Sequence, residues 1–311
     1  MAPRIVTLTL NPAVDLACEA EVIRPTHKIR TTGERHDPGG GGINVSRVVA
    51  GFGGETEAIV LAGGPTGQLL EALLDEGGIP RTSIPIAGMT RISQTVLERS
   101  TGREYRFVPE GPGLAEAEWR QVLARLETVE GDWIVASGSL PSGVPQDFYA
   151  QTARIARRRG QRFALDTSGA ALKAALDGDV TLIKPSLSEL QSLVGRELPD
   201  PADQDRALLQ LVRDGAAEII ALTLGADGAV LATNSGVLRL PALKVEVRGA
   251  VGAGDSFLAA MVLALANGRS VEDAFAWGIA AGAAAVSRSG TAHPERADVE
   301  VLRRQIGTPL E

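Results

Sequence analysis

Short apolar runs alternate regularly along this chain with longer segments of helical periodicity. The apolar runs, each bounded by turn residues, lie at residues 5–10, 58–61, 133–137, 163–166, 181–183 and 219–223. The helical patterns lie between them, at residues 43–51, 66–76, 116–126, 146–159, 187–194 and 203–214. This alternation is typical of βαβ units, and right-handed crossovers place the helices on both faces of a parallel sheet. The sequence therefore predicts an α/β fold of three layers around a mostly parallel central sheet.

Two segments interrupt this alternation, because they have strand-like patterns with exposed charges and no helix of their own. They are residues 13–36 and 84–108, and the second is predicted to be a hairpin that turns at Thr101 and Gly102. We expect them to form a small projecting β-sheet, a lid over the edge of the main sheet where open α/β folds bind ligands. The α/β domain would then comprise residues 1–12, 37–83 and 109–311.

The carboxyl-terminal part of the chain departs from the parallel pattern. Residues 228–247 are predicted to form antiparallel strands that follow the parallel set. Residues 271–286 are strongly apolar, but the acidic residues Glu272 and Asp273 and the many Ala and Gly residues favour a buried core helix over a membrane span. The last residues of the chain are predicted to form a charged helix that ends in a frayed tail.

The charge balance and the cysteine content narrow the classes of partner and compartment. Acidic residues outnumber basic ones by 38 to 31, which gives a net charge of -7 and does not favour nucleic acid as a partner. The one cysteine, Cys18, excludes an internal disulfide and fits a reducing compartment. The first residues run directly into a strand pattern without a signal peptide, and no segment is long and apolar enough for a membrane span. We therefore expect a cytoplasmic protein without a nucleic-acid or membrane partner.

The strongest chemical signal is a glycine-rich turn directly before an apolar helical run at residues 258–266. The turn contains Gly252, Ala253 and Gly254, and the acidic residue Asp255 follows it. Small residues leave the first backbone N–H groups of a helix free, and together with the helix dipole these groups bind anions. Asp255 would lie beside a bound phosphate, where it can accept a proton from an attacking hydroxyl. The alternative is that Asp255 only caps the helix, since Asp is a favoured N-cap residue.

Three further motifs are weaker when each is taken alone. Four glycines, residues 39–42, precede Asn44 at the start of a predicted helix, and they either let the backbone approach a ligand or form a flexible loop. Residues 223–228 end a predicted strand and have the composition of an ordinary turn. Ser186 and Glu189 match a capping box for the following helix, which is the alternative to a role in ligand binding.

In combination, these motifs resemble the ribokinase/PfkB family of carbohydrate kinases over nearly the full length of the chain. The order of the motifs is specific: an Asp after the first strand, Gly-Gly-x-x-x-Asn, Lys-Pro-x-x-x-Glu, Thr-x-Gly-x-x-Gly and Gly-Ala-Gly-Asp. The family implies a ribokinase-like α/β fold with a β-sheet lid, and ATP-dependent phosphorylation of a sugar hydroxyl. In this resemblance Asp255 is the catalytic base. The N–H groups of Gly252, Ala253 and Gly254 offset the charge that develops on the transferred phosphoryl group.

Several segments resemble the branch of the family that acts on phosphorylated sugars, which contains 1-phosphofructokinase, tagatose-6-phosphate kinase and the minor bacterial 6-phosphofructokinase. These segments are residues 7–12, 39–45, 90–91 and 137–141. The first two enzymes typically carry Lys at the position of Gly41, whereas the all-glycine version resembles the minor 6-phosphofructokinase. Residues 11–12 and 141–143 instead resemble the 1-phosphofructokinases. Because Gly41 would line the substrate, we favour fructose 6-phosphate as the sugar.

The resemblance assigns the sugar and its phosphate to the edge of the main sheet and to the lid. The sugar hydroxyls would be held by Asp15, Gly40, Asn44 and Ser139, beside Gly39 and Gly41. Arg91 and Arg106, on the lid strands, would bind the phosphate already on the sugar, since a planar guanidinium binds phosphate through two parallel hydrogen bonds. Lys28 would reach the same phosphate, across a subunit interface if two lids pair. The alternative for these three cations is a solvated face of the lid.

The resemblance also assigns the nucleotide and the metal ions. The ATP would be bound by Lys184, Ser186, Thr223, Gly225, Asp227, Gly228 and Gly254, with a helix containing Ala280 and Ala283 beside the adenine. Glu189 would position Mg²⁺ through water, because Mg²⁺ keeps much of its hydration shell. The family usually has Asn at the position of Ser186, so an amide donor is lost here. The carbonyls of a monovalent-cation site, which makes K⁺ a candidate activator, would be those of Gly249, Val251, Ala285 and Gly290.

The expected reaction is therefore the phosphorylation of fructose 6-phosphate to fructose 1,6-bisphosphate by ATP and Mg²⁺, in a homodimer that pairs through the lid. 1-Phosphofructokinase and tagatose-6-phosphate kinase are the alternatives within the enzyme class. A regulator that binds a sugar phosphate on the same fold without catalysis is the alternative from another class. The presence of Asp255 argues against the regulator, because a binding protein has no need of a base at that position.

Overall fold

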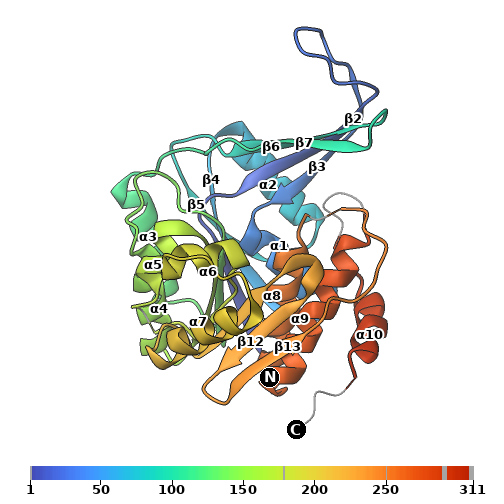
Figure 1. Ribbon diagram of the computed structural model, residues 1–311. Helices are drawn as coiled ribbons and strands as arrows, with labels where there is room; N and C mark the ends of the chain where they lie inside the picture. Colours follow the sequence, from blue (N-terminus) through green and yellow to red (C-terminus); the bar gives the residue numbers. More distant parts are fainter. Residues whose placement is uncertain (1, 178, 250, 289–292, 308–311) are drawn as a thin grey trace.

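The computed structural model (Figure 1) describes residues 2–177, 179–249, 251–288 and 293–307, and it is built around one large sheet. The strands of this sheet are β1 Arg4–Thr9, β4 Glu55–Ala62, β5 Arg81–Pro85, β8 Trp133–Ser137, β9 Arg162–Asp166, β10 Leu182–Ile183, β11 Ile219–Thr223, β12 Ala229–Thr233 and β13 Gly236–Leu240. They lie in the order β13-β12-β11-β10-β9-β8-β1-β4-β5. All neighbours from β11 to β5 pair in parallel, while β12 and β13 add antiparallel strands at one end. The prediction of a mostly parallel sheet is confirmed.

Helices cover both faces of the large sheet, which gives the expected three layers. One face carries α3 Glu116–Leu126, α4 Phe148–Arg158, α5 Gly169–Ala175, α6 Leu187–Val194 and α7 Pro201–Arg213. The other face carries α1 Gly41–Gly51, α2 Gly64–Glu76, α8 Ala253–Ala266, α9 Val271–Val286 and α10 Arg296–Gln305. Side chains of a strand point to alternate faces. Ile5 of β1 therefore joins the core beneath α8 and α9, whereas Val6 and Leu8 join the core on the opposite face.

The carboxyl-terminal helices agree with the patterns in the sequence. α9 is the buried helix expected for residues 271–286, and it packs against α8 and α10. Within the described ranges, no helix combines the length and the apolar character that crossing a bilayer requires. α10 is the expected charged helix. The frayed tail predicted after it falls on residues 308–311, which lie outside the described residues.

A second, four-stranded sheet projects from the large one (Figure 1). Its strands are β2 Ala13–Ala20, β3 Thr31–Gly39, β6 Arg91–Glu98 and β7 Arg103–Phe107, in the order β3-β2-β6-β7. β6 and β7 form the predicted hairpin. Residues 21–30, which connect β2 to β3, extend furthest from the large sheet (Figure 1). The prediction of a small separate sheet is confirmed.

Several boundaries differ from the predicted ones. β3 continues to Gly39, beyond the predicted lid end at residue 36, because its last residues still pair with β2. β5 belongs to the large sheet, so residues 84–85 are not part of the small one. The sequence patterns missed β5, which is largely polar and buries only Ile84 fully, and the short helix α5, and residues 241–247 contain no strand. The division of the chain into a kinase domain and a lid domain stays a prediction.

The packing of α8 on α9 positions the turn before Asp255, and it depends on an aromatic pair. Phe257 of α8 and Phe275 of α9 meet edge to face, with ring centroids 5.8 Å apart, and Phe275 has no exposed surface. We expect Phe275→Ala to lower the free energy of unfolding by roughly 3–5 kcal/mol, the usual cost of truncating a buried Phe. Urea unfolding followed by circular dichroism measures this change.

The matched control for this prediction is Val301→Ala on α10, where Val301 is 51% exposed. Its free energy of unfolding should change by less than about 0.5 kcal/mol, as is usual for surface substitutions. Equal losses in the two variants would contradict the role given to the aromatic pair.

Candidate active site

Polar residues gather where the parallel strands of the large sheet end. Ser137 is the last residue of β8, Asp166 is the last residue of β9, and Lys184 directly follows β10. The amino-terminal ends of α1 and α8 reach the same edge, where Asn44 of α1 contacts Asp255 of α8. Open α/β folds bind their ligands at this edge of the sheet.

Asp255 lies in the first turn of α8, and both of its carboxylate oxygens accept hydrogen bonds. Nδ2 of Asn44 donates a bond of 2.9 Å to Oδ2, and Oγ of Ser137 donates one of 3.2 Å to Oδ1. The N-cap of the helix is Gly252, with a φ of 76°, and no side chain of the described residues caps the helix. The alternative that Asp255 only caps the helix is therefore wrong, since its carboxylate faces α1 and β8.

The surroundings of Asp255 raise its pKa above that of an ordinary carboxyl group. Burial and the carboxylate of Asp166 raise the pKa of Asp255 to about 6, against the opposing effects of Asn44, Lys184 and Ser137. A general base works best when its pKa lies near the operating pH. Position and pKa therefore both suit Asp255 to accept a proton.

Lys184 lies against the glycine turn at the start of α8. Its Nζ is 3.0 Å from Oδ2 of Asp166, and only 7% of the residue is exposed. Burial disfavours the charge, but the carboxylates of Asp166, Asp255 and Glu189 outweigh burial and raise the pKa of Lys184, so its side chain is a cation. A Cβ on Gly254 would lie 3.2 Å from Nζ, so the ammonium group closely approaches the turn. This cation and the free N–H groups of α8 together suit the phosphates of a nucleotide.

The four-glycine segment is not the flexible loop that was the alternative, because Gly39 ends β3 and Gly41 begins α1. A Cβ on Gly41 would overlap Oγ of Ser137 and lie 3.1 Å from Oδ1 of Asp255. A Cβ on Gly39 would overlap the carboxyl group of Asp15. The absence of a side chain at Gly41 therefore allows α1 to approach β8, and the absence of one at Gly39 allows β3 to approach the side chain of Asp15 on β2.

Asp15 lies on the face of the small sheet that also carries the predicted phosphate-binding arginines. Asp15 of β2 pairs with Asp37 of β3. On β6, Arg91 lies two residues before Ser93, the partner of Asp15, so its side chain points to the same face as Asp15. Arg106 of β7 pairs with Thr95, two residues after Ser93, and therefore also points to this face. Burial and Asp37 raise the pKa of Asp15 to about 6, and the charges of Arg106, Arg91 and Arg47 oppose that rise. The predicted sugar residue and the predicted phosphate ligands thus lie near one another.

The other predicted sugar residues lie around this face. Gly40 is the N-cap of α1, with a φ of 123° that favours glycine. Ser139 follows β8, and its Oγ accepts a hydrogen bond of 3.3 Å from Nδ2 of Asn11. Lys28 lies exposed in the projecting segment 21–30, without a hydrogen bond or ion pair to any residue that the structure describes.

Arg91 also has partners within the protein. Its Nη1 and Nη2 donate hydrogen bonds of 2.8 Å each to the carbonyls of Pro109 and Asn11. The side chain of Asn11 donates a bond of 2.8 Å to the carbonyl of Glu110. Arg91 and Asn11 therefore fasten the segment after β7 to the end of β1. Each Nη carries two hydrogens, so donors remain for a phosphate, and that role of Arg91 stays a prediction.

Ser186 and Glu189 form the predicted capping box of α6. N of Ser186 donates a hydrogen bond of 2.7 Å to Oε2 of Glu189, and N of Glu189 donates one of 3.4 Å to Oγ of Ser186. Oε1 of Glu189 has no partner among the described residues. No group of three or more His, Cys, Asp or Glu side chains in these residues would hold a metal ion. One available oxygen fits an ion such as Mg²⁺ that is held largely by water and substrate phosphates.

The predicted nucleotide residues after β11 lie along one turn. Thr223 and Ser186 form an isolated parallel bridge, so the end of β11 lies beside the start of α6. Gly225 and Gly228 have φ values of 60° and 99°, which glycine adopts without strain. Asp227 lies exposed between them. The order of these residues therefore agrees with the motif, and their contacts to ATP stay a prediction.

The two residues predicted to flank the adenine differ in accessibility. Ala280 has no exposed surface, whereas Ala283, one turn later in α9, is partly exposed. Direct contact between Ala280 and a ligand would need α9 to move, because packed cores leave no room beside their side chains. Of the two, only Ala283 is accessible to a nucleotide.

The predicted monovalent-cation site falls partly outside the described residues, because Gly290 is not among them. Within them, N of Gly249 donates a hydrogen bond of 3.2 Å to the carbonyl of Val286. The segment that contains Gly249 and Val251 therefore lies beside the end of α9, which contains Ala285. This arrangement brings three of the four predicted residues into one region, and ion binding stays a prediction.

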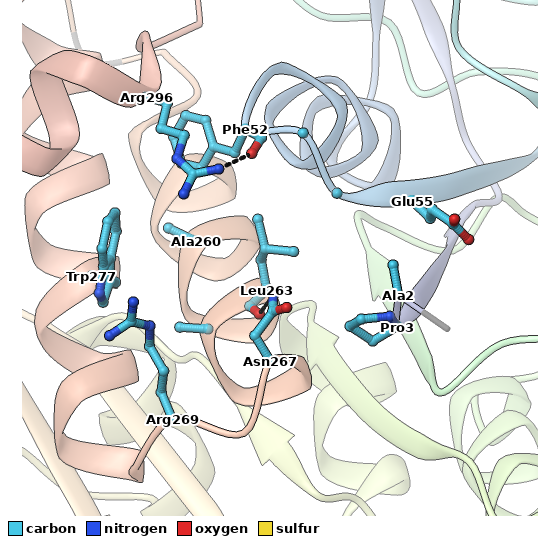
Figure 2. A pocket seen from close by; sticks show the side chains of 13 residues that line it. Ala2, Pro3, Phe52, Glu55, Ala260, Leu263, Asn267, Arg269, Trp277 and Arg296 are labelled. Carbon is cyan, nitrogen blue, oxygen red and sulfur yellow. Dashed lines mark hydrogen bonds between the residues drawn. The ribbon is translucent and has the colours of Figure 1, made fainter.

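A pocket of about 350 Å³ lies at the opposite edge of the sheet (Figure 2). Its lining includes Pro3 before β1, Gly53 before β4 and Trp277 of α9. Figure 2 also shows Arg296, whose Nη1 donates a hydrogen bond of 2.8 Å to the carbonyl of Phe52. No residue of the predicted site lines this pocket. Parallel strands begin at this edge, so the fold places ligands at the other one.

Sequence patterns missed two polar residues that complete the candidate site. Ser137 donates to Asp255, and Asp166 pairs with Lys184. Each ends an otherwise apolar strand. A polar last residue on a buried parallel strand is the signal that identifies such positions.

Known proteins share this arrangement of motifs. The family described as pfkB family carbohydrate kinase matches residues 8–298. The ATP-dependent 6-phosphofructokinase isozyme 2 of Mycobacterium tuberculosis is 44% identical over 311 residues, which cover 99% of this chain and 91% of that protein. The chain belongs to the pfkB family of carbohydrate kinases. The predicted membership of this family is confirmed, and with it an ATP-dependent sugar kinase.

Two further relatives of this pfkB-family kinase bear on its substrate. ATP-dependent 6-phosphofructokinase isozyme 2 of Escherichia coli is 40% identical over 290 residues, 93% of this chain and 94% of that protein. The 1-phosphofructokinase of Bacillus subtilis is 31% identical over 303 residues, 97% of each chain.

Solved structures confirm the predicted ribokinase-like fold of this pfkB-family kinase. Phosphofructokinase-2 of E. coli in complex with potassium matches with a TM-score of 0.95 and 38% identity, over 98% of this chain and 100% of that one. Its complex with fructose-6-phosphate matches with a TM-score of 0.93 and 37% identity, over the same shares. Its tetrameric inhibited form matches with a TM-score of 0.92 and 37% identity, again over those shares.

The contact between Gly41 and Ser137 leads to a prediction about this kinase. In Gly41→Ala the added methyl group displaces Ser137, which holds the carboxylate of Asp255. We expect kcat to fall by roughly 10–100-fold, since small misplacements of catalytic groups have effects of this order. Steady-state kinetics with the sugar substrate and ATP measures the change.

The control for Gly41→Ala is Gly51→Ala at the other end of the same helix, where an added Cβ meets no atom within 4 Å. Gly51→Ala should keep kcat within about twofold, because Ala is at least as good a helix residue as Gly. A Gly41→Ala enzyme that is as active as this control would show that Ser137 is not needed to hold Asp255.

The raised pKa of Asp255 predicts how activity depends on pH. A general base must be deprotonated to act. We therefore expect kcat/KM for the sugar to reach its maximum above the pKa of Asp255 and to decline as the pH falls through about 6. The pKa of Asp15 is also about 6, so two groups take up protons in the same range. The decline of kcat/KM should therefore be steeper than the decline that a single protonation would produce. An acid limb near pH 4, the range of an ordinary carboxyl group at about 3.9, would contradict the burial argument.

Proposed function

We propose that this protein is an ATP-dependent 6-phosphofructokinase, which transfers the γ-phosphoryl group of ATP to the 1-hydroxyl of fructose 6-phosphate. The observation that carries the proposal is the position of Asp255. It touches Asn44 on the sugar side and lies within the electrostatic reach of Lys184 on the nucleotide side. The relatives at 40–44% identity bear the name of this activity, and the E. coli protein was solved with fructose-6-phosphate.

In the proposed reaction Asp255 takes the proton of the sugar hydroxyl while the hydroxyl oxygen attacks the γ-phosphorus. The new O–P bond forms as the bond to the β-phosphate oxygen breaks, and ADP leaves. Asn44 and Ser137 hold the carboxylate in the position for proton transfer. Lys184 and the N–H groups at the start of α8 offset the charge on the phosphoryl group. Such transfers depend on positioning and electrostatics more than on covalent help.

The sugar would lie between the small sheet and the start of α1. Asp15, Gly40, Asn44 and Ser139 would hold its hydroxyls. Arg106 and the remaining donors of Arg91 would bind its phosphate, supported by the fact that both lie on the Asp15 face of the small sheet. Lys28 is exposed in the segment 21–30. It would reach the phosphate across the subunit interface of a dimer, or if that segment folds over the site of its own chain.

The position of Gly41 supports fructose 6-phosphate over its rivals. A side chain at this position would overlap Ser137. The 1-phosphofructokinases and tagatose-6-phosphate kinases typically carry Lys at this position, and a Lys has no room here unless Ser137 moves. Substrates whose binding requires that Lys are therefore disfavoured.

The nucleotide and the ions would lie on the other side of Asp255. ATP would contact the turn from Thr223 to Gly228 with Asp227, the capping box at Ser186, and Ala283. When bound, Mg²⁺ would neutralise charge on the β- and γ-phosphates, and Oε1 of Glu189 is available to hold it through water. K⁺ is proposed near Gly249, because the E. coli relative with the same fold was solved with potassium.

We also propose a cytoplasmic homodimer that pairs through the small sheet. Ile92 and Phe107 are 41% and 57% exposed, and the register places both on the face opposite to Asp15. Exposed apolar side chains gathered on one face of a sheet favour association. The E. coli relative forms a tetramer in its inhibited form, so that protein assembles from copies of itself. The single cysteine, Cys18, supports the cytoplasmic location, since it fits a reducing compartment.

The assignment of the base is tested by Asp255→Asn. Asn keeps the shape of the side chain but accepts no proton, so kcat should fall by at least roughly 10²–10⁴-fold, the usual contribution of general-base catalysis. Calorimetric titration should show that ATP still binds. An Asp255→Asn enzyme with near wild-type kcat would remove Asp255 from the mechanism.

The substrate is tested by assaying fructose 6-phosphate, fructose 1-phosphate and tagatose 6-phosphate, each with Mg-ATP. The highest kcat/KM is expected for fructose 6-phosphate. A higher value for fructose 1-phosphate or tagatose 6-phosphate would replace the proposed substrate with that sugar. Binding without turnover for all three would favour the sugar-phosphate-binding regulator.

A further inference from the structure

Arg47 lies on the same face of α1 as two residues of the candidate active site. Gly41, Asn44 and Arg47 are spaced by three, and each is partly exposed while the residues between them are buried. Gly41 and Asn44 face Asp255. Arg47 continues this line one turn further along the helix.

Arg47 reaches β3 of the small sheet, where it contacts Asp37. Its Nη2 lies 3.7 Å from Oδ1 of Asp37, and its Nη1 donates a hydrogen bond of 3.4 Å to the carbonyl of Pro38. Asp37 lies directly opposite Asp15 in the antiparallel register of β2 and β3, so the two carboxylates share one face. Like charges in this position repel, and two neighbouring carboxylates tend to share one proton unless a cation compensates them.

We propose that Arg47 is a positioning residue that keeps the Asp15–Asp37 carboxylate pair ionised and in place, so that Asp15 can accept hydrogen bonds from the sugar. This inference rests on the proposed function, because it takes Asp15 as a sugar-binding residue. Arg47 touches no reacting atom and acts through Asp37. The helix α1 then serves both parts of the site, since Asn44 orients the base and Arg47 maintains the sugar-binding carboxylate.

Several charges act on Asp15, and the distinguishing feature of Arg47 is its contact with Asp37. Asp15 faces one acid and three bases, namely Asp37 from β3, Arg106 from β7, Arg91 from β6 and Arg47 from α1, and Arg106 and Arg91 lower the pKa of Asp15 more than Arg47 does. Arg47 also forms an ion pair with Asp37, the acid that raises the pKa of Asp15. Arg91 gives two of its nitrogens to backbone carbonyls, and Arg106 is exposed to solvent. The side chain of Arg47 is only 19% exposed, so water and salt screen its charge less.

Two further groups near Asp37 do not replace Arg47. Nε of Arg35 lies 2.7 Å from Oδ2 of Asp37, closer than Arg47, but its side chain is 49% exposed and it is not among the charges that shift the pKa of Asp15. Burial and the charge of Arg47 lower the pKa of His293 to about 3, although Asp37 opposes this. His293 is therefore neutral near neutral pH and supplies no cation.

The test is Arg47→Met, which removes the charge and keeps an apolar stem. Without the cation, Asp15 should hold a proton up to a higher pH. The acid limb of kcat/KM for fructose 6-phosphate should move upward by about one pH unit, which is a tenfold loss on that limb. At alkaline pH, where Asp15 is ionised in both enzymes, the difference in kcat/KM between Arg47→Met and the wild type should shrink. KM for ATP should change less than about twofold, because the nucleotide lies on the other side of Asp255.

Two rescue variants separate this role from a structural one. Arg47→Lys keeps a cation and should recover most of the affinity for the sugar. Arg47→Met combined with Asp37→Asn removes the repulsion and should return the acid limb toward its wild-type position. Arg35→Met is the matched control, because it also removes a cation from Asp37 but an exposed one, and it should leave both KM values nearly unchanged.

An equal rise of both KM values in Arg47→Met, with the acid limb unmoved, would overturn the proposal. A double variant with the same acid limb as Arg47→Met alone would overturn it as well. If Arg47→Met does not fold, Arg47→Gln, alone and combined with Asp37→Asn, replaces it with the same expected results. Failure of the proposed function appears separately, in the wild-type assay with the three sugar phosphates. The variants are then compared with the sugar phosphate that is turned over, or by calorimetric binding of fructose 6-phosphate if none is.

Discussion

The hydrogen bond from Asn44 to Asp255 is the interaction on which the candidate site depends. It joins the first turns of α1 and α8, which lie 211 residues apart in the chain. Ser137, at the end of β8, holds the other oxygen of the same carboxylate. One acidic side chain is thus fixed by two helices and a strand. Because those elements also carry the sugar-facing and nucleotide-facing residues, the position of the base relative to both substrates follows from this contact.

The absence of side chains at Gly39 and Gly41 allows the close packing around Asp15 and Asp255. A Cβ on Gly41 would overlap Ser137, and one on Gly39 would overlap Asp15. Glycine is therefore needed here for close packing between protein groups, in addition to any approach of a ligand. The same constraint limits which phosphosugar pattern the site can adopt. Packing at the start of α1 thus connects the geometry of catalysis with the choice of substrate.

Burial and charge divide the site into regions with different protonation. Asp255 and Asp15 are both partly buried, and the loss of hydration together with a neighbouring carboxylate raises the pKa of each to about 6. Lys184 is buried as well, but its carboxylate neighbours keep it charged. A proton acceptor therefore stands next to a permanent cation, which suits the transfer of a proton and of a negatively charged phosphoryl group. On the small sheet, arginines surround Asp15 and suit the phosphate of a sugar.

The alternation of strands and helices, the small second sheet, the capping box of α6, and the motifs that contain Asp255, Asn44 and Lys184 could all be predicted from the amino-acid sequence. These features are local, since periodicity and short motifs depend on neighbours in the chain. Three findings required the folded molecule: Asp255 is held by Asn44 and does not cap α8, Ala280 is buried, and Ser137, Asp166 and Arg47 belong to the site. Each of these findings depends on contacts between distant segments, and a single polar residue at a strand end or on a helix face has no periodic signal. Burial and opposing charges set the chemistry of these side chains, and both arise only when the strands and helices have packed.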